Sequence, residues 1–140
     1  MSPSRLLVAL IKLFEGCRLR AYLCPAGVPT NGWGTTGPDV KLGVVWDQAT
    51  ADARMEADAL MFETASRAQC PTADTEGRQA ALADFAYNLG LTRLKGSTLR
   101  RRALAGDWDA VAVELNKWVF AAGKKLPGLV KRRAAEAALL

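Results

Sequence analysis

The sequence predicts an α+β domain that is mainly α-helical and has two lobes. Three observations support this fold class: an amphipathic helical pattern at the start of the chain, a segment rich in glycine and proline after it, and helical patterns over the remainder. A chain of 140 residues has room for one domain with a substantial core, but not for two. We therefore expect residues 1–140 to form a single domain.

The first expected element is an N-terminal helix over residues 5–15. Its apolar side chains recur at spacings of three and four residues and so share one face: Leu6, Leu7, Leu10, Leu13 and Phe14. Ser2 and Ser4 are candidate caps before this helix, and Gly16 is a natural stop after it. The apolar run is short, contains Lys12 and leads to no cleavage pattern, so we expect no signal peptide and no stable membrane insertion.

Residues 16–46 are expected to form a small β-rich lobe. They include nine glycines and prolines, and P-A-G at residues 25–27 is a turn signal between two short segments. A linking helix is expected over about residues 47–67, with Asp47 as its N-cap. Residues from about 72 to 140 are expected to form a helical lobe. A first helix over 76–89 is expected to stop at Gly90, and a short basic helix is expected between Ser97 and Gly106. Asp107 should begin a further helix that runs through Trp118, and Pro127 should begin the last one.

The amino-acid composition limits the chemistry that the chain can perform. There is no histidine, which excludes Ser-His and Cys-His dyads, HExxH zinc sites and histidine bases. The three cysteines, Cys17, Cys24 and Cys70, form no CxxC pair, so neither a disulfide framework nor a zinc ribbon is expected. The net charge of +5 and the pI near 9.4 favour an anionic partner, which can be nucleic acid, a membrane surface or a bacterial cell wall.

Glu15 is the first candidate for acid–base chemistry. It closes the first expected helix, where unpaired carbonyls and the helix dipole disfavour negative charge, so its carboxyl group should keep its proton more firmly than usual. A general acid that protonates a glycosidic oxygen near neutral pH needs this property. Taken alone, the residue fits a solvated glutamate at a helix end better, and the surrounding sequence decides between the two interpretations.

The residues around Glu15 form a long motif. E-G-C-R-L-R-A-Y runs from Glu15 to Tyr22, and Cys24, Thr30 and G-W-G at residues 32–34 follow it. This segment resembles the signature of the T-even-type phage lysozymes, family 24 of the glycoside hydrolases, which runs E-G-x-R-L-x-x-Y-x-D/C-x-x-G-x-x-T-x-G-x-G. Both spacings of that family are kept, because eight residues separate Glu15 from Cys24 and five separate Cys24 from Thr30.

The resemblance continues through the second half of the chain. F-A-Y-N-L-G at residues 85–90 is similar to the family's F-x-x-N-x-G, and G-S-T-L at residues 96–99 is similar to its helix cap. Trp118, P-G-L-V-K-R-R at residues 127–133 and Glu136 are similar to the family's closing pattern. The resemblance thus covers nearly the whole chain and implies a lysozyme-like fold, with a small β-hairpin lobe and a helical C-terminal lobe.

Carried over by position, the resemblance assigns Glu15 as the acid, Cys24 to the aspartate-or-cysteine place and Thr30 to the place that positions the attacking water. The reaction needs a proton donor on one face of the sugar and, on the other, a group that orients water and tolerates oxocarbenium-like charge. A thiol is mostly neutral at pH 7 unless a cation such as Arg18 or Arg20 lowers its pKa. Three interpretations of Cys24 stay open: a water-orienting or stabilising group, a nucleophile that forms a thioglycoside, or a small buried side chain.

Four further residues are supporting candidates. Arg132 and Arg133 lie on the last helix, which in the family packs behind the first, so one of them is expected to pair with Glu15; the alternative is a solvated basic face. Asn88 is a candidate to bind substrate, to bridge the lobes or to cap its helix. Trp33 is a candidate to stack on a sugar or to anchor the small lobe.

The resemblance implies an endolysin that hydrolyses the β-1,4 bond between N-acetylmuramic acid and N-acetylglucosamine in peptidoglycan, with no metal and no cofactor. A catalytically weak peptidoglycan-binding relative and a lytic transglycosylase are the alternatives. The resemblance also implies a monomer that stays in the host cytoplasm until a holin opens the membrane. Nucleic-acid binding is not expected, because no binding motif accompanies the basic runs at residues 100–102 and 131–133. Dinucleotide binding is not expected either, because no helix pattern follows G-W-G-T-T-G at residues 32–37.

Overall fold

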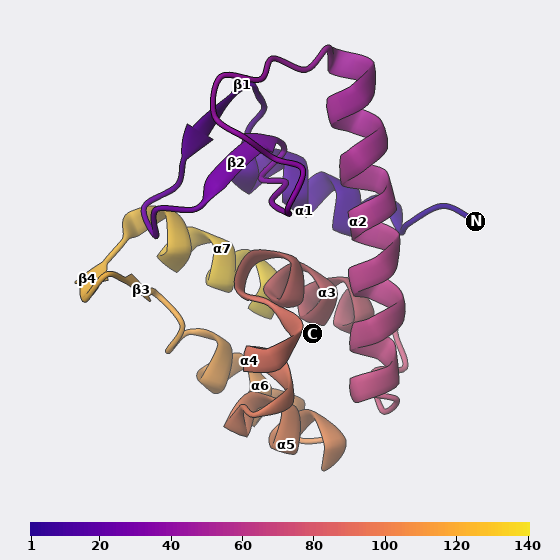
Figure 1. The fold of residues 1–140 in the computed structure, drawn as a ribbon. Helices are drawn as coiled ribbons and strands as arrows, with labels where there is room; N and C mark the ends of the chain where they lie inside the picture. The colour runs from indigo at the N-terminus through magenta and orange to yellow at the C-terminus, as the bar shows by residue number, and fades with distance from the viewer.

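The computed structural model describes residues 1–140 and confirms the predicted fold class, which is mainly helical with a small antiparallel hairpin. In Figure 1 the β1–β2 hairpin lies near one end of the long helix α2, and the short helices α4 to α6 lie toward its other end. No helix has both the length and the apolar character that a membrane crossing requires. In chain order the elements are α1 (Arg5–Glu15), β1 (Arg18–Leu23), β2 (Pro29–Gly32), α2 (Gln48–Gln69), α3 (Glu76–Leu89), α4 (Leu91–Lys95), α5 (Thr98–Leu104), α6 (Trp108–Leu115), β3 (Phe120–Ala121), β4 (Lys124–Lys125) and α7 (Pro127–Ala137).

The small lobe is built on the hairpin of β1 and β2. The two strands pair antiparallel, with Tyr22 opposite Thr30. The turn between them is closed by the backbone N–H of Gly27, which donates to the carbonyl of Cys24 over 2.8 Å. Positive φ at Gly27 (78°) allows this tight reversal. The turn therefore brings Cys24 and Thr30 to the same end of the hairpin.

Helix α2 connects the two lobes. Asp47 caps it by accepting a hydrogen bond from the backbone N–H of Thr50 over 2.7 Å. The helix continues to Gln69, slightly beyond the expected end near residue 67, because the break comes only at Pro71. Its length carries the chain from the hairpin to the far end of the helical lobe (Figure 1).

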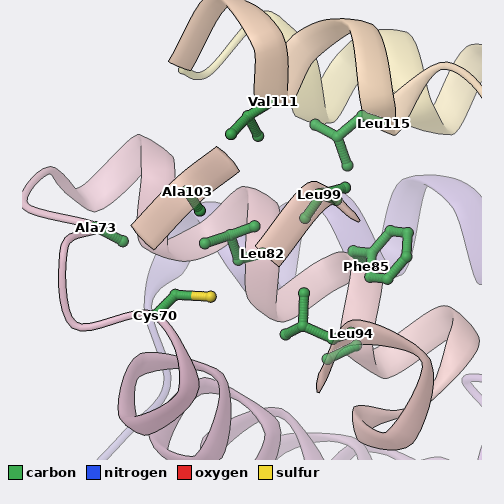
Figure 2. Packing of buried hydrophobic residues seen from close by; sticks show 10 residues of the cluster. Cys70, Ala73, Leu82, Phe85, Leu94, Leu99, Ala103, Val111 and Leu115 are labelled. Atoms are coloured by element: carbon green, nitrogen blue, oxygen red, sulfur yellow. The ribbon is translucent and has the colours of Figure 1, made fainter. Parts of the chain in front are cut away.

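The helical lobe packs around α3. Every side chain from Ala80 to Ala86 on this helix is buried. Figure 2 shows Leu82 and Phe85 of α3 among apolar side chains of α4, α5 and α6. Because this stretch is buried on every side, its single charged residue, Asp84, requires a partner inside the protein. The buried cluster consists of Cys70, Ala73, Leu82, Phe85, Ala86, Leu94, Leu99, Ala103, Val111 and Leu115.

The segment between α6 and α7 differs from the expectation. The helix expected through Trp118 ends at Leu115, and a second hairpin, β3–β4, follows. Its turn uses Ala122 and Gly123, both with positive φ (50° and 76°), as tight hairpin turns require. Trp118 itself packs edge-on against Phe85, with ring centroids 5.4 Å apart, and so belongs to the margin of the core.

Candidate active site

A cleft of about 470 Å³ lies between the hairpin and the helical lobe. It is lined by Glu15 at the end of α1, Cys24 and Thr30 on the hairpin, and Asn88 on α3. A second hollow of about 840 Å³, between the end of α1 and the start of α7, adjoins the cleft and shares Glu15 and Asn88 with it. Four side chains singled out from the sequence therefore meet at one place, although they come from three separate elements.

The carboxyl group of Glu15 is held from two sides. Its side chain is 19% exposed, and Nη1 of Arg132 donates to its Oε2 over 3.1 Å. On another side the backbone of Gly34 lies so close that a Cβ at that position would be 2.7 Å from Cδ of Glu15. Gly34 also has a φ of +79°, so glycine satisfies both the backbone conformation and the space. The acid is thus fixed between a cation of the helical lobe and the backbone of the small lobe.

A buried carboxylate keeps Arg132 in place. Asp84 accepts two hydrogen bonds from Arg132, one at each carboxylate oxygen and each 2.8 Å long. The two side chains are 0% and 3% exposed. Burial by itself would raise the pKa of Asp84, but the hydrogen bonds from Arg132 hold this pKa below its usual value. Asp84, Arg132 and Glu15 therefore form a chain of ionic contacts that runs from the core into the cleft.

Arg133 binds a different set of residues from Arg132. Its Nη2 donates to Oδ1 of Asn88 over 2.9 Å and to Oε2 of Glu136 over 2.8 Å. Burial is the main cause that raises the pKa of Glu136 well above its usual value, and a hydrogen bond with Asp84 raises it further. Arg132 and Arg133 are both buried, so the interpretation of these two residues as a solvated face is wrong. Of the two, Arg132 is the one that contacts the candidate acid.

Cys24 and Thr30 lie together at the turn of the hairpin. Partial burial acts to raise the pKa of the Cys24 thiol, but hydrogen bonds from the backbone of Val28 and from the Thr30 hydroxyl outweigh it, so the pKa of Cys24 is lowered. The expected cause was a cation, but the arginine at position 18 instead stacks on the Tyr22 ring, 4.4 Å from its centroid. The Thr30 hydroxyl is also 2.9 Å from the Val28 carbonyl. Thr30 can therefore serve either neighbour as a hydrogen-bond donor.

Trp33 lies outside the lining of the cleft. Its indole N–H donates to Asp52 of α2 over 2.7 Å, and its carbonyl accepts from the Tyr87 hydroxyl over 2.6 Å. These bonds fit an anchor of the small lobe rather than a platform for a sugar. Asn88, by contrast, lines both hollows, whereas Gly90 is the residue that ends its helix. Its position fits a contact with substrate better than a cap.

Sequence reasoning missed two residues that the structure places next to this site, Asp84 and Tyr87. Asp84 carried a usable signal, because a charged residue within a buried helical stretch implies a buried partner. For Tyr87 no local pattern indicates a bond to residue 33. No three His, Cys, Asp or Glu side chains lie close enough to hold a metal ion, and all three cysteines are free thiols.

Comparison with known proteins gives consistent matches over most of the chain. The family model "Phage lysozyme" matches residues 12–136. An endolysin of Acyrthosiphon pisum secondary endosymbiont phage 1 is 37% identical over 136 residues, which cover 94% of this chain and 92% of the relative. A SAR-endolysin of Escherichia phage Mu is 35% identical over 125 residues, 89% of this chain and 72% of the relative.

Solved structures agree with these matches. The endolysin from Escherichia coli O157:H7 phage FAHEc1 is 34% identical, with a TM-score of 0.84 over 99% of this chain and 92% of that one. The active form of P1 phage endolysin Lyz gives a TM-score of 0.82 at 29% identity (98% and 83% covered). Its secreted inactive form gives only 0.65 at 28% identity (97% and 93% covered). On this evidence, together with the motif around Glu15, the chain belongs to the phage lysozyme family.

Proposed function

We propose that this chain is an endolysin that hydrolyses the β-1,4 bond between N-acetylmuramic acid and N-acetylglucosamine in peptidoglycan, with Glu15 as the general acid. The observation that carries the proposal is the cleft in which Glu15 lies with Cys24 and Thr30. Family membership supports peptidoglycan hydrolysis as the activity. The similarity to the active form of a relative supports a cleft that is ready to bind substrate.

In the proposed reaction, Glu15 gives its proton to the bridging oxygen while the C–O bond breaks. Arg132 orients the Glu15 carboxyl group by a hydrogen bond, and the negative charge of Asp84 offsets part of the positive charge of Arg132 at that position. Asn88 is held by Arg133 and lines the cleft, where we assign its amide group to bind the substrate. The helical lobe thus positions the proton donor.

Cys24 and Thr30 act from the hairpin. We assign them the task of orienting the attacking water, because the Thr30 hydroxyl is close to both the Cys24 sulfur and the Val28 carbonyl. The lowered pKa of Cys24 increases the thiolate fraction, which helps to stabilise the positive charge that develops on the sugar. Attack by the sulfur to form a thioglycoside is the competing role, and plain packing of a small side chain is the third.

Clearing of cell-wall suspensions tests Glu15 directly. Wild-type protein is expected to clear walls, and Glu15→Gln is not, because the amide has no acidic proton to give. Glu56→Gln is the matched control, since Glu56 is exposed on α2 outside the cleft, and it should clear walls like wild type. Equal clearing by Glu15→Gln would remove Glu15 from the mechanism, and binding without clearing by wild type would favour the weak-binding alternative.

Mass analysis of the digested glycan separates hydrolysis from transglycosylation. Reducing muramic acid ends are expected, because water is the attacking group in the proposed reaction. Anhydro-muramic ends would instead identify a lytic transglycosylase and end the proposal of hydrolysis.

We further propose that the chain acts as a monomer and reaches the wall when a holin opens the host membrane. Its relative from phage Mu is a SAR-endolysin, so release by a signal anchor is the competing route. Expression with and without a holin distinguishes the two routes, with lysis expected only in the presence of the holin. Lysis without it would favour the competing route.

A further inference from the structure

Tyr87 joins the two lobes beside the acid. It lies on α3, and its hydroxyl donates to the backbone carbonyl of Trp33 over 2.6 Å. The same hydroxyl also faces the Thr35 side chain. No other hydrogen bond or ion pair of the structure connects residues 16–46 directly with residues 72–140. The other hydrogen bonds and ion pairs of these two segments reach each other only through residues of α1 or α2, such as Asp52 and Glu15. The Tyr87 hydroxyl is therefore the direct polar link between the hairpin lobe and the helical lobe beside the cleft.

The carbonyl that Tyr87 binds belongs to the peptide unit between Trp33 and Gly34. That unit is the part of the small lobe that touches Glu15, since a Cβ on Gly34 would be 2.7 Å from the Glu15 carboxyl carbon. The other end of Trp33 is fixed by Asp52 on α2. Tyr87 thus binds the peptide unit against which the acid rests.

The surroundings of Tyr87 keep its hydroxyl available as a donor. The ring packs edge-on against Phe62 of α2, with centroids 5.5 Å apart, and this contact fixes the ring independently of the hydroxyl. Burial raises the pKa of Tyr87, and the negative charges of Glu15 and Asp58 raise it further. The hydroxyl therefore stays protonated over the whole pH range in which hydrolysis of cell walls can be assayed.

We propose that Tyr87 is a positioning residue, whose bond to the Trp33 carbonyl holds the peptide before Gly34 against Glu15 and so fixes the orientation of the proton donor in the cleft. This inference rests on the proposed role of Glu15. It assigns to the third residue of F-A-Y-N-L-G a task that is separate from substrate binding. Loss of the hydroxyl should leave the fold intact and allow the loop of residues 31–35 to move.

The test compares Tyr87→Phe with Tyr22→Phe. These are the only two tyrosines of the chain, both line the cleft, and the Tyr22 hydroxyl makes no hydrogen bond between the lobes. Hydrogen exchange followed by mass spectrometry reads the backbone amides of Asn31 and Thr35, which bond to each other's carbonyls over 2.9 and 2.8 Å. Faster exchange of this segment is expected in Tyr87→Phe and not in Tyr22→Phe.

Kinetics on soluble glycan fragments supply the second readout. We expect Tyr87→Phe to lower kcat by about ten- to a hundredfold while KM changes little, because a misplaced acid affects the chemical step more than binding. Wild-type kcat in Tyr87→Phe, or exchange equal to that of Tyr22→Phe, would overturn the inference. Glu15→Gln in the same assay separates failure of this inference from failure of the proposed function. If Tyr87→Phe behaves like wild type but Glu15→Gln is inactive, only the positioning role fails. If Glu15→Gln is active, the proposed function fails, and the positioning role fails with it.

Discussion

Replacement of Asp84 by alanine tests how much the buried ionic chain contributes to the fold. The side chain is fully buried, and both of its oxygens bind Arg132, which is itself 3% exposed. In Asp84→Ala the guanidinium keeps only its 3.1 Å contact with Glu15 and loses its two shorter bonds. The variant therefore leaves most of a buried positive charge without a partner.

Removal of one partner from a buried ion pair costs about 3–5 kcal/mol. The whole free energy of unfolding of a domain is about 5–15 kcal/mol, so this single change removes a large share of it. For a domain of this size, 1 kcal/mol corresponds to a change in Tm of roughly 4 °C, so Tm should fall by about 10–20 °C.

Thermal unfolding followed by circular dichroism measures the effect, with Asp39→Ala as the matched control. Asp39 also forms an ion pair with an arginine, Arg54, but the two side chains are 62% and 32% exposed. Exposed pairs of this kind contribute little, so the control should unfold almost like wild type. Equal Tm values for the two variants would refute the claim that burial makes the Asp84 pair important.

The loss of stability in Asp84→Ala should also depend on pH. The pKa of Asp84 is lowered in the folded protein, so its contribution is complete above the unfolded value of about 3.9 and is lost as pH falls through the folded pKa. The difference in stability between wild type and Asp84→Ala should therefore narrow below about pH 3.9. A difference that grows toward low pH would contradict this assignment.

Two further changes test the cleft by wall clearing. Gly34→Ala should lose activity by about a hundredfold or more, because the new Cβ displaces the carboxyl group of Glu15; Gly43→Ala has similar backbone strain (φ +86°) but open space around its Cβ, and should stay active. Cys24→Asp should remain active and Cys24→Ala should lose most activity. An alanine variant at position 24 with full activity would exclude Cys24 from the mechanism.

Much of the fold follows from local signals in the sequence. The first helix ends at Glu15 because Gly16 follows it, and α3 ends at Leu89 because Gly90 follows it. The hairpin that joins Cys24 and Thr30 follows from a turn whose glycine adopts positive φ. Such features are short-range, so a single sequence contains what is needed to predict them.

The remaining features depend on contacts between distant segments. Asp84 binds Arg132 across 48 residues, and Tyr87 binds Trp33 across 54. Helical periodicity can place Asp84 on a buried face, but it cannot identify the partner. The β3–β4 hairpin was missed for a different reason, because one of its two positive-φ positions is occupied by Ala122, which gives no turn signal.

The contact between Glu15 and Arg132 joins residues 117 positions apart. The acid therefore leaves the ribosome 117 residues before the arginine that orients it. A nascent chain that still lacks α7 has no cation for Glu15 and no partner for the buried Asp84. The oriented acid of the cleft therefore forms only after α7 has been synthesised and has packed against α1 and α3.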